Sequence, residues 1–177
     1  ITGDLGTVGA EIGSLQLQSV GSMRFSAGDR AIRALRDVTL ASLDGADLFV
    51  TMDGDLLVEA GTDITFGEGL QVDGSASLSA TAGGTLSNKA IMHVDGDLSF
   101  TGGTIDNDLA LTAEGDLTLA VTDGVLWSDD ALQAGGDMSL SGTQGVVSGV
   151  SMTTTSGDIT MHSDNGAVVV QGDVQSS

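Results

Sequence analysis

The stretch Gly96-Asp97-Leu98-Ser99-Phe100 decides the fold of this chain, because its pattern returns along most of the sequence. In each copy a Gly-Asp pair is followed by apolar residues that alternate with small or polar ones. The further copies lie at residues 54–58, 115–119, 136–140 and 157–161. From Asp97 the pattern advances by 19, 21 and 21 residues, and it extends backwards through Ser77, Asp55 and Asp37. The sequence therefore predicts a repeat of about 20 residues over seven units.

Each unit is expected to hold at least two short strands. Alternation of apolar and polar residues with a period of two is typical of a strand with one buried face. A second series of such segments lies at residues 46–50, 62–66 and 107–111. Gly, Asp, Asn and Ser stand between the segments and favour turns.

Units of this length cannot each build a core, so they must stack on one another. The simplest arrangement is a parallel β-helix, a solenoid with coils of about 20 residues. The chain has no Pro, which fits strands that must donate hydrogen bonds along their whole length. An antiparallel β-sandwich is the alternative; it explains the short strands but not the steady period. The residues expected to point inward are Leu98, Phe100, Leu117, Leu119, Met138, Leu140, Ile159 and Met161.

The chain is expected to form one continuous solenoid with two parts. Residues 1–44 match the repeat poorly and are predicted to be irregular or N-terminal coils, whereas residues 45–177 form the repeat β-helix. The first part contains four of the five basic residues, and their spacing is compatible with a short helical turn after Asp29. These four residues are either a contact with the acidic flank of a neighbouring copy or a solvated face. They are Arg24, Arg30, Arg33 and Arg36.

Composition excludes several classes of protein. The 177 residues include 25 acidic and 5 basic side chains, a net charge of −20, which argues against nucleic-acid binding. No apolar run approaches the roughly 20 residues that a membrane span requires, so membrane insertion is not expected. The chain contains no Cys and therefore no disulfide. It begins at Ile1 without a recognisable leader, which suggests a processed product or a piece of a longer protein.

The repeated Asp residues are the main candidates for a binding function. If the period sets the stacking, Asp97, Asp116, Asp137 and Asp158 lie above one another along one corner. One interpretation is that each carboxylate accepts backbone N–H bonds in its turn. The other is that calcium bridges the ladder, because calcium favours carboxylate and carbonyl oxygens. The densest carboxylate pairs, and hence the candidate calcium ligands, are Asp53, Asp55, Asp95 and Asp97.

No catalytic residues are assigned, and the chain is not expected to be an enzyme. The carboxylates occupy periodic turn positions, and no pair stands out as an acid and base. His93 and His162 lie 69 residues apart without the spacing of a zinc site. Trp127 is either partly buried core or a platform on which a sugar stacks. No cofactor other than calcium is expected.

Three repeats, at residues 94–100, 113–119 and 134–140, resemble those of filamentous-haemagglutinin-type secreted proteins. The resemblance covers roughly residues 45 to 165. It implies a right-handed β-helix, export across the bacterial envelope, and a location outside the cell or on the bacterial surface.

These observations lead to two functional hypotheses. The first is a structural protein, an extracellular β-helical stalk or spacer of a bacterial surface adhesin. The second is a self-assembling subunit of an extracellular filament or surface sheath, with calcium as a stabilising ion. The expected partners are further copies, stacked end to end, or the rest of a longer β-helical chain. A carbohydrate-binding module that uses Trp127 is a third class.

Overall fold

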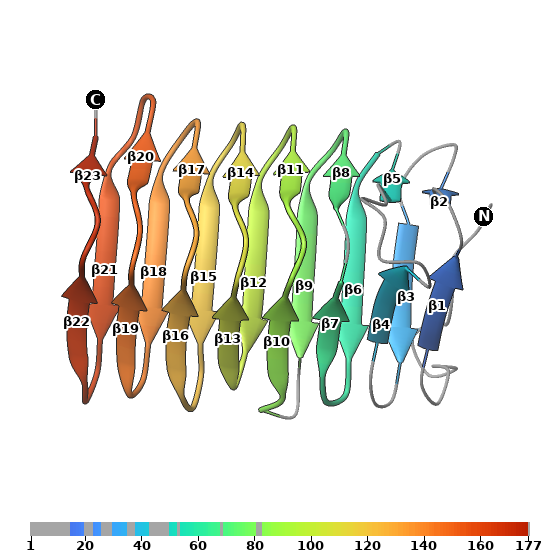
Figure 1. Cartoon of the computed structure of the whole chain (residues 1–177), viewed down its shortest axis with the longest axis horizontal. Coiled ribbons are helices and arrows are strands. Elements are labelled where there is room, and N and C mark those ends of the chain that lie inside the picture. Colours follow the sequence, from blue (N-terminus) through green and yellow to red (C-terminus); the bar gives the residue numbers. More distant parts are fainter. Residues whose placement is uncertain are drawn as a thin grey trace.

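The computed structural model is an all-β solenoid of parallel sheets (Figure 1). It describes residues 15–19, 23–25, 30–34, 38–42, 50–52, 54–67, 69–80 and 83–176, and within these ranges it describes side chains from Met52 onward. The described part contains strands and turns and no helix. From β3 onward each coil contributes one strand to each of three sheets, and the strands of successive coils lie side by side along the long axis.

The strands of the three sheets follow one another in a fixed rotation. The first sheet consists of β1 (Leu15–Ser19), β4 (Val38–Ser42), β7 (Ile64–Phe66), β10 (Thr85–Asn88), β13 (Thr104–Asn107), β16 (Val125–Ser128), β19 (Gly145–Ser148) and β22 (Ala167–Val170). The second sheet consists of β2 (Met23–Phe25), β5 (Val50–Met52), β8 (Leu70–Val72), β11 (Met92–Val94), β14 (Leu111–Ala113), β17 (Leu132–Ala134), β20 (Met152–Thr154) and β23 (Val174–Gln175). The third sheet consists of β3 (Arg30–Ala34), β6 (Leu56–Ala60), β9 (Ala76–Ala80), β12 (Leu98–Gly102), β15 (Leu117–Val121), β18 (Met138–Gly142) and β21 (Ile159–Ser163).

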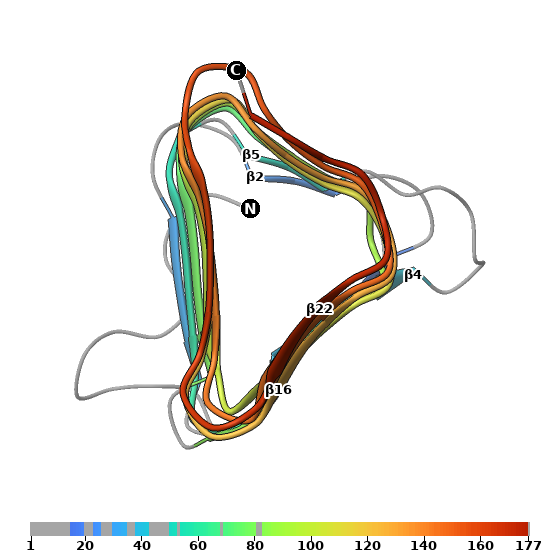
Figure 2. The ribbon, with the colours of Figure 1, turned by 90° about the vertical axis from the view of Figure 1, so that its left-hand side faces the viewer.

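The three sheets enclose a triangular interior (Figure 2). Seen from the C-terminal end, the chain passes from the third sheet to the first and then to the second in a counterclockwise direction while it advances toward the viewer. The solenoid is therefore right-handed. All pairings between the described strands are parallel, for example Leu98 with Leu117 and Leu117 with Met138, which excludes the antiparallel sandwich.

The interior is filled by the alternate residues of each strand. Six of the eight residues predicted to point inward, those in β12, β15 and β18, are buried. The remaining two, Ile159 and Met161 of β21, pack against this core but are only partly buried. Their inward positions are correct, since Ile159 pairs with Met138 and Met161 with Leu140. They are less buried because β21 is the last strand of its sheet within the described residues, with no described coil above it.

The strand register corrects three details of the sequence-based prediction. Ser75, rather than Ser77, occupies the corner before β9, because Ala76 pairs with Leu98. At the N-terminal end Arg30 pairs with Leu56, so the step between coils there is 26 residues and not the 18 that separate Asp37 from Asp55. The segment 107–111 is not one strand but spans the corner between β13 and β14.

The residues after Asp29 do not form a helical turn. Residues Arg30–Ala34 form β3, and β3 pairs in parallel with β6. The alternation of Arg30, Ile32 and Ala34 with Ala31 and Arg33 has the period of a strand, and pairing with β6 determines the conformation of the segment. The described strands of residues 15–42 belong to the same three sheets as the rest of the chain.

Candidate functional site

A ladder of hydrogen bonds runs along the corner that precedes the third sheet. The Asp97 carboxylate accepts the backbone N–H of Asp116 at 2.9 Å, and Asp116 in turn accepts that of Asp137 at 2.8 Å. Asp137 accepts the N–H of Asp158 at 2.9 Å. The corner ladder continues toward the N-terminus, where the Asp55 carboxylate accepts the N–H of Ser75 at 2.7 Å.

The corner ladder modifies the prediction that each Asp caps its own turn. The carboxylates do accept backbone N–H bonds, but each donor belongs to the next coil, about 20 residues further along the chain. Each bond therefore joins two coils as well as satisfying a turn. A hydrogen bond to an ionised acceptor contributes about 1.5–3 kcal/mol, which offsets a repulsion of about 1 kcal/mol between neighbouring carboxylates that are solvated by water.

The position of the carboxylate explains why Gly precedes Asp in the repeat. A Cβ atom on Gly136 would overlap the Asp116 carboxylate oxygen that accepts the Asp137 N–H. The same overlap would arise between Gly115 and Asp97, and between Gly157 and Asp137. The Gly-Asp pair is thus a single unit: Asp supplies the N–H, and Gly leaves room for the carboxylate from the coil below.

We expect Asp116→Ala and Gly136→Ala to be non-additive. Each should lower the free energy of unfolding by about 1–2 kcal/mol, because each removes the bond to the Asp137 N–H. The loss of free energy of unfolding in the double variant should be about 1 kcal/mol smaller than the sum of the losses in the two single variants. Urea denaturation monitored by circular dichroism measures these changes. The control Asp123→Ala removes the same charge at another corner and should lower the free energy of unfolding by less. Additive losses in the Asp116→Ala, Gly136→Ala double variant would contradict the shared hydrogen bond.

The four candidate calcium ligands fall at different places in the fold. Asp53 lies outside the described residues, and Asp55 and Asp97 belong to the corner ladder. Asp95 lies beside His93, with 3.2 Å between the carboxylate and Nε2. Among the side chains that the structure describes, no group of three or more His, Asp and Glu residues is arranged to hold a metal ion. Calcium binding stays a prediction.

The two histidines each lie next to carboxylates on the outside of the solenoid. His93 Nε2 is also 4.0 Å from Glu114, and His162 Nε2 is 2.9 Å from Asp164. All these side chains are largely exposed, and exposed ion pairs contribute at most about 1 kcal/mol. The two histidines lie in different sheets, His93 in β11 and His162 in β21.

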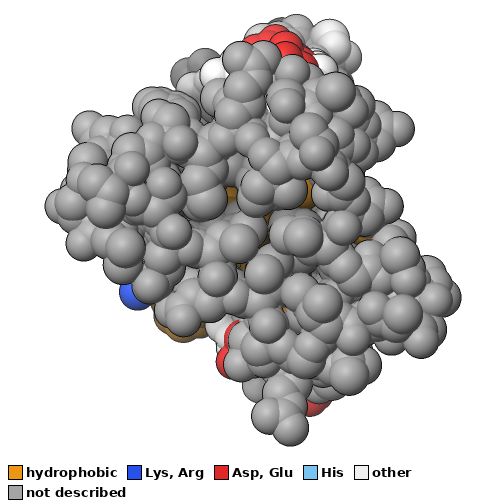
Figure 3. All heavy atoms as spheres, turned by 90° about the vertical axis from the view of Figure 1, so that its right-hand side faces the viewer, with side chains coloured by type: hydrophobic (Ala, Val, Ile, Leu, Met, Phe, Trp, Pro, Cys, Tyr) orange, Lys and Arg blue, Asp and Glu red, His pale blue; other side chains and the backbone are white. Residues whose placement is uncertain are grey.

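The four arginines belong to the N-terminal end. Arg24 lies in β2, and Arg30 and Arg33 lie in β3, where Arg33 is in register with Glu59 of β6. Arg36 and the side chains of the other three lie outside the described part of the chain. Figure 3 faces this end and shows acidic side chains at its upper and lower rims. The intersubunit contact proposed for these arginines stays a prediction.

A second ladder, made of buried polar side chains, lies inside the solenoid at the end of the first sheet's strands. Asn88 Nδ2 donates to Asn107 Oδ1 at 2.7 Å, and Asn107 Nδ2 donates to Ser128 Oγ at 3.1 Å. Asn88 also bonds both main-chain groups of Ala90, which fixes the corner. The sequence pattern does not reveal this interior ladder, because Asn is typical of exposed turns. Its members nevertheless recur at intervals of 19 to 21 residues: Asn88, Asn107, Ser128 and Ser148.

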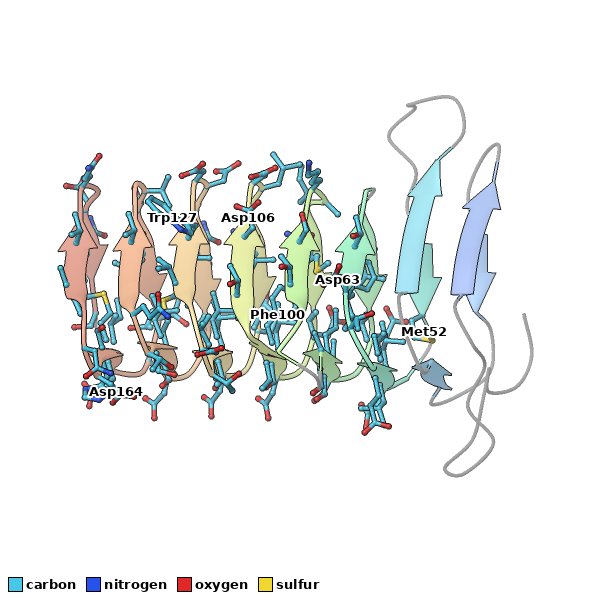
Figure 4. All side chains as sticks on the ribbon, turned by 90° about the horizontal axis from the view of Figure 1, so that it is seen from below. Met52, Asp63, Phe100, Asp106, Trp127 and Asp164 are labelled. Atoms are coloured by element: carbon cyan, nitrogen blue, oxygen red, sulfur yellow. The ribbon has the colours of Figure 1, made fainter. Side chains whose placement is uncertain are left out.

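Trp127 lies on the outer face of the first sheet and is 46% exposed. It is in register with Asp106 of β13 on one side and Val147 of β19 on the other. Figure 4 shows Trp127 and Asp106 on neighbouring coils. Its outward position separates it from the core, contrary to the interpretation as partly buried core, and its ring is available for contact.

Asp106, which is in register with Trp127, is repelled by two neighbouring carboxylates. Burial raises the pKa of Asp106 above its ordinary value of 3.8, and Asp108 and Asp129 raise it further, while Lys89 lowers it. A raised pKa in the folded state means that ionised Asp106 disfavours folding. The penalty is absent at low pH, where both states are protonated, and develops as the pH rises above the ordinary pKa.

We therefore expect Asp106→Asn to stabilise the fold at neutral pH. The urea midpoint should rise at about pH 7, and the gain should disappear at about pH 3, where Asp106 is protonated in either state. Asp123→Asn is the matched control, since it removes a charge elsewhere. An equal rise of the urea midpoint at pH 7 and at pH 3 would show that the stabilisation by Asp106→Asn does not come from ionisation of Asp106.

No family model, curated protein or solved structure matches the chain. The described residues contain no helix of the length and apolarity needed to cross a membrane. What the geometry itself defines is a right-handed parallel β-solenoid with a polar ladder on one outer corner and another in its interior.

Proposed function

We propose that this chain is a structural segment, the stalk or spacer of an extracellular bacterial surface adhesin. The observation that carries the proposal is the continuity of the three sheets along the long axis (Figure 1). From β3 onward each described coil bonds to the next through all three sheets and, in the Asp-bearing coils, also through the corner ladder. A load applied along the axis is thus shared by many backbone hydrogen bonds, which suits a stiff spacer.

The charge distribution supports the same role. Residues 37–177 contain 22 acidic residues and a single basic one. Because like charges repel, this net charge keeps neighbouring rods soluble and apart. The resemblance to filamentous-haemagglutinin-type repeats adds the location, outside the cell or on its surface.

The C-terminal coil favours a second candidate function, self-assembly into a filament or sheath. Val168 and Val174 occupy inward positions, in register with the buried Val146 and Met152, yet they are 42% and 47% exposed. This end therefore presents apolar side chains and the edges of β21, β22 and β23, on which a further coil fits. In a filament that coil belongs to another copy.

Electron microscopy of the purified 177-residue chain separates the two functions. A stalk segment should give separate short rods, whereas a self-assembling subunit should give ordered fibres. Fibres that form only with calcium would support both the filament and the calcium ladder.

The surface location is tested on cells. Antibodies raised against the chain should label intact bacteria of the source strain. Labelling only after the envelope is permeabilised would contradict a surface stalk.

A further inference from the structure

Four residues of the first sheet's outer face combine exposed apolar side chains with a carboxylate, and together they are here called the Trp127 strip. Strand register places Asp106, Trp127, Val147 and Val169 in this order on successive coils. Trp127 and Val169 are 46% and 37% exposed. Neighbouring strands lie about 4.8 Å apart, so the indole, the two valines and the carboxylate form one continuous surface.

The surroundings of the Trp127 strip are strongly acidic. Asp108 and Asp129 are close enough to Asp106 to influence its ionisation, and Lys89 is the one cation among the groups that do so. Beyond residue 36, Lys89 is also the one basic residue in the sequence. The carboxylates beside Trp127 are therefore only partly neutralised by the chain itself.

We propose that the Trp127 strip binds an arginine-bearing segment of a partner protein. A guanidinium group stacks on the faces of aromatic rings and pairs with carboxylates, and Trp is the ring that binds cations best. A guanidinium on Trp127 lies within reach of Asp106, one strand away. Val147 and Val169 then contact the apolar residues next to that arginine. Trp and Arg are also the side chains that most often dominate protein interfaces.

Charge favours this occupant over a sugar. A neutral glycan stacks on Trp as well, but it leaves in place the repulsion that Asp108 and Asp129 exert on Asp106. An arginine relieves that repulsion. The proposal is independent of the stalk function, because a rod without this contact still acts as a spacer.

The chain supplies its own probe for the test. It has one Trp and no Tyr, so its tryptophan fluorescence reports on the Trp127 strip alone. The ligand is an acetylated and amidated Val-Arg-Val-Arg-Val peptide, titrated at about 0.15 M salt, where long-range attraction is screened. We expect a saturable change of fluorescence, and binding about tenfold weaker when citrulline replaces arginine.

Variants separate the site from the general negative charge. Asp106→Asn should raise the Kd about tenfold, whereas Asp164→Asn, which removes the same charge from the last described coil, should change it less than twofold. Trp127→Val should abolish binding of the peptide, measured by calorimetry because the variant has no Trp, while its circular dichroism spectrum stays unchanged. Failure to saturate, equal binding of the citrulline peptide, or equal effects of the two Asp variants would overturn the proposal. The arginine proposal would also be overturned, in favour of a sugar platform, if neutral oligosaccharides gave a saturable change of fluorescence and Asp106→Asn left their binding unchanged.

Discussion

Replacing Phe100 by alanine should lower the free energy of unfolding by about 4 kcal/mol, the largest single effect expected in this chain. Phe100 is fully buried in β12 and is among the largest side chains of the core. It lies between Leu78 and Leu119 of the adjacent coils. Because the backbone on both sides is fixed by sheet hydrogen bonds, the coils cannot collapse into the cavity.

The matched control for Phe100→Ala is Ser99→Ala. Ser99 precedes Phe100 in the same strand but points outward, so its loss should change the free energy of unfolding by no more than about 0.5 kcal/mol. Urea denaturation followed by circular dichroism measures both variants. Equal effects of the two substitutions would contradict the assigned inward and outward faces.

Asn107→Ala should destabilise the fold by about 3 kcal/mol, the second-largest effect. The change removes the acceptor of the Asn88 amide and the donor to Ser128, both inside the solenoid. A buried polar group that loses a partner costs about 1–3 kcal/mol, and two groups are affected here, although Asn88 keeps its bond to Ala90 and Ser128 keeps its bond to Asp130. The interior ladder thus makes Asn107 more important than its position at a turn suggests.

Thermal and urea denaturation of Asn107→Ala and Asn107→Ser measure this effect. Ser128 holds the same position one coil further on with a hydroxyl, so Asn107→Ser should recover part of the loss. Thr112→Ala, on an outward position of the neighbouring sheet, is the control and should be close to neutral. An Asn107→Ala variant as stable as that control would contradict the interior ladder.

The period and the alternation of the sequence were sufficient to predict the solenoid and its core. Residues such as Leu98, Leu117 and Met138 repeat at a nearly constant interval and always follow Gly-Asp, so both the stacking and the buried face could be derived. The resemblance supplied the handedness. These features are local and repeated, and each unit confirms the others.

The rest depends on contacts between coils, which a single repeat does not contain. That Asp97 accepts the N–H of Asp116, and not one from its own turn, requires the register of two coils. The N-terminal register was wrong because 26 residues separate Arg30 from Leu56, a longer step than the repeat. Asn88 and Asn107 were missed because Asn is equally common in exposed turns.

The parallel solenoid is tested most directly by distances along one register column of the first sheet. The chain has no Cys, so pairs of introduced cysteines can carry spin labels without competition. Strand register places Thr39, Thr65, Val147 and Val169 in one column, with Ser87, Asp106 and Trp127 between Thr65 and Val147.

Double electron–electron resonance on three pairs of this column gives the axial rise of the coils. For stacked coils the distances should increase in equal steps of about 4.8 Å, to about 19 Å for Thr65 with Val147, about 24 Å for Thr65 with Val169 and about 29 Å for Thr39 with Val169. Distances that do not rise steadily with the number of coils would contradict the parallel solenoid.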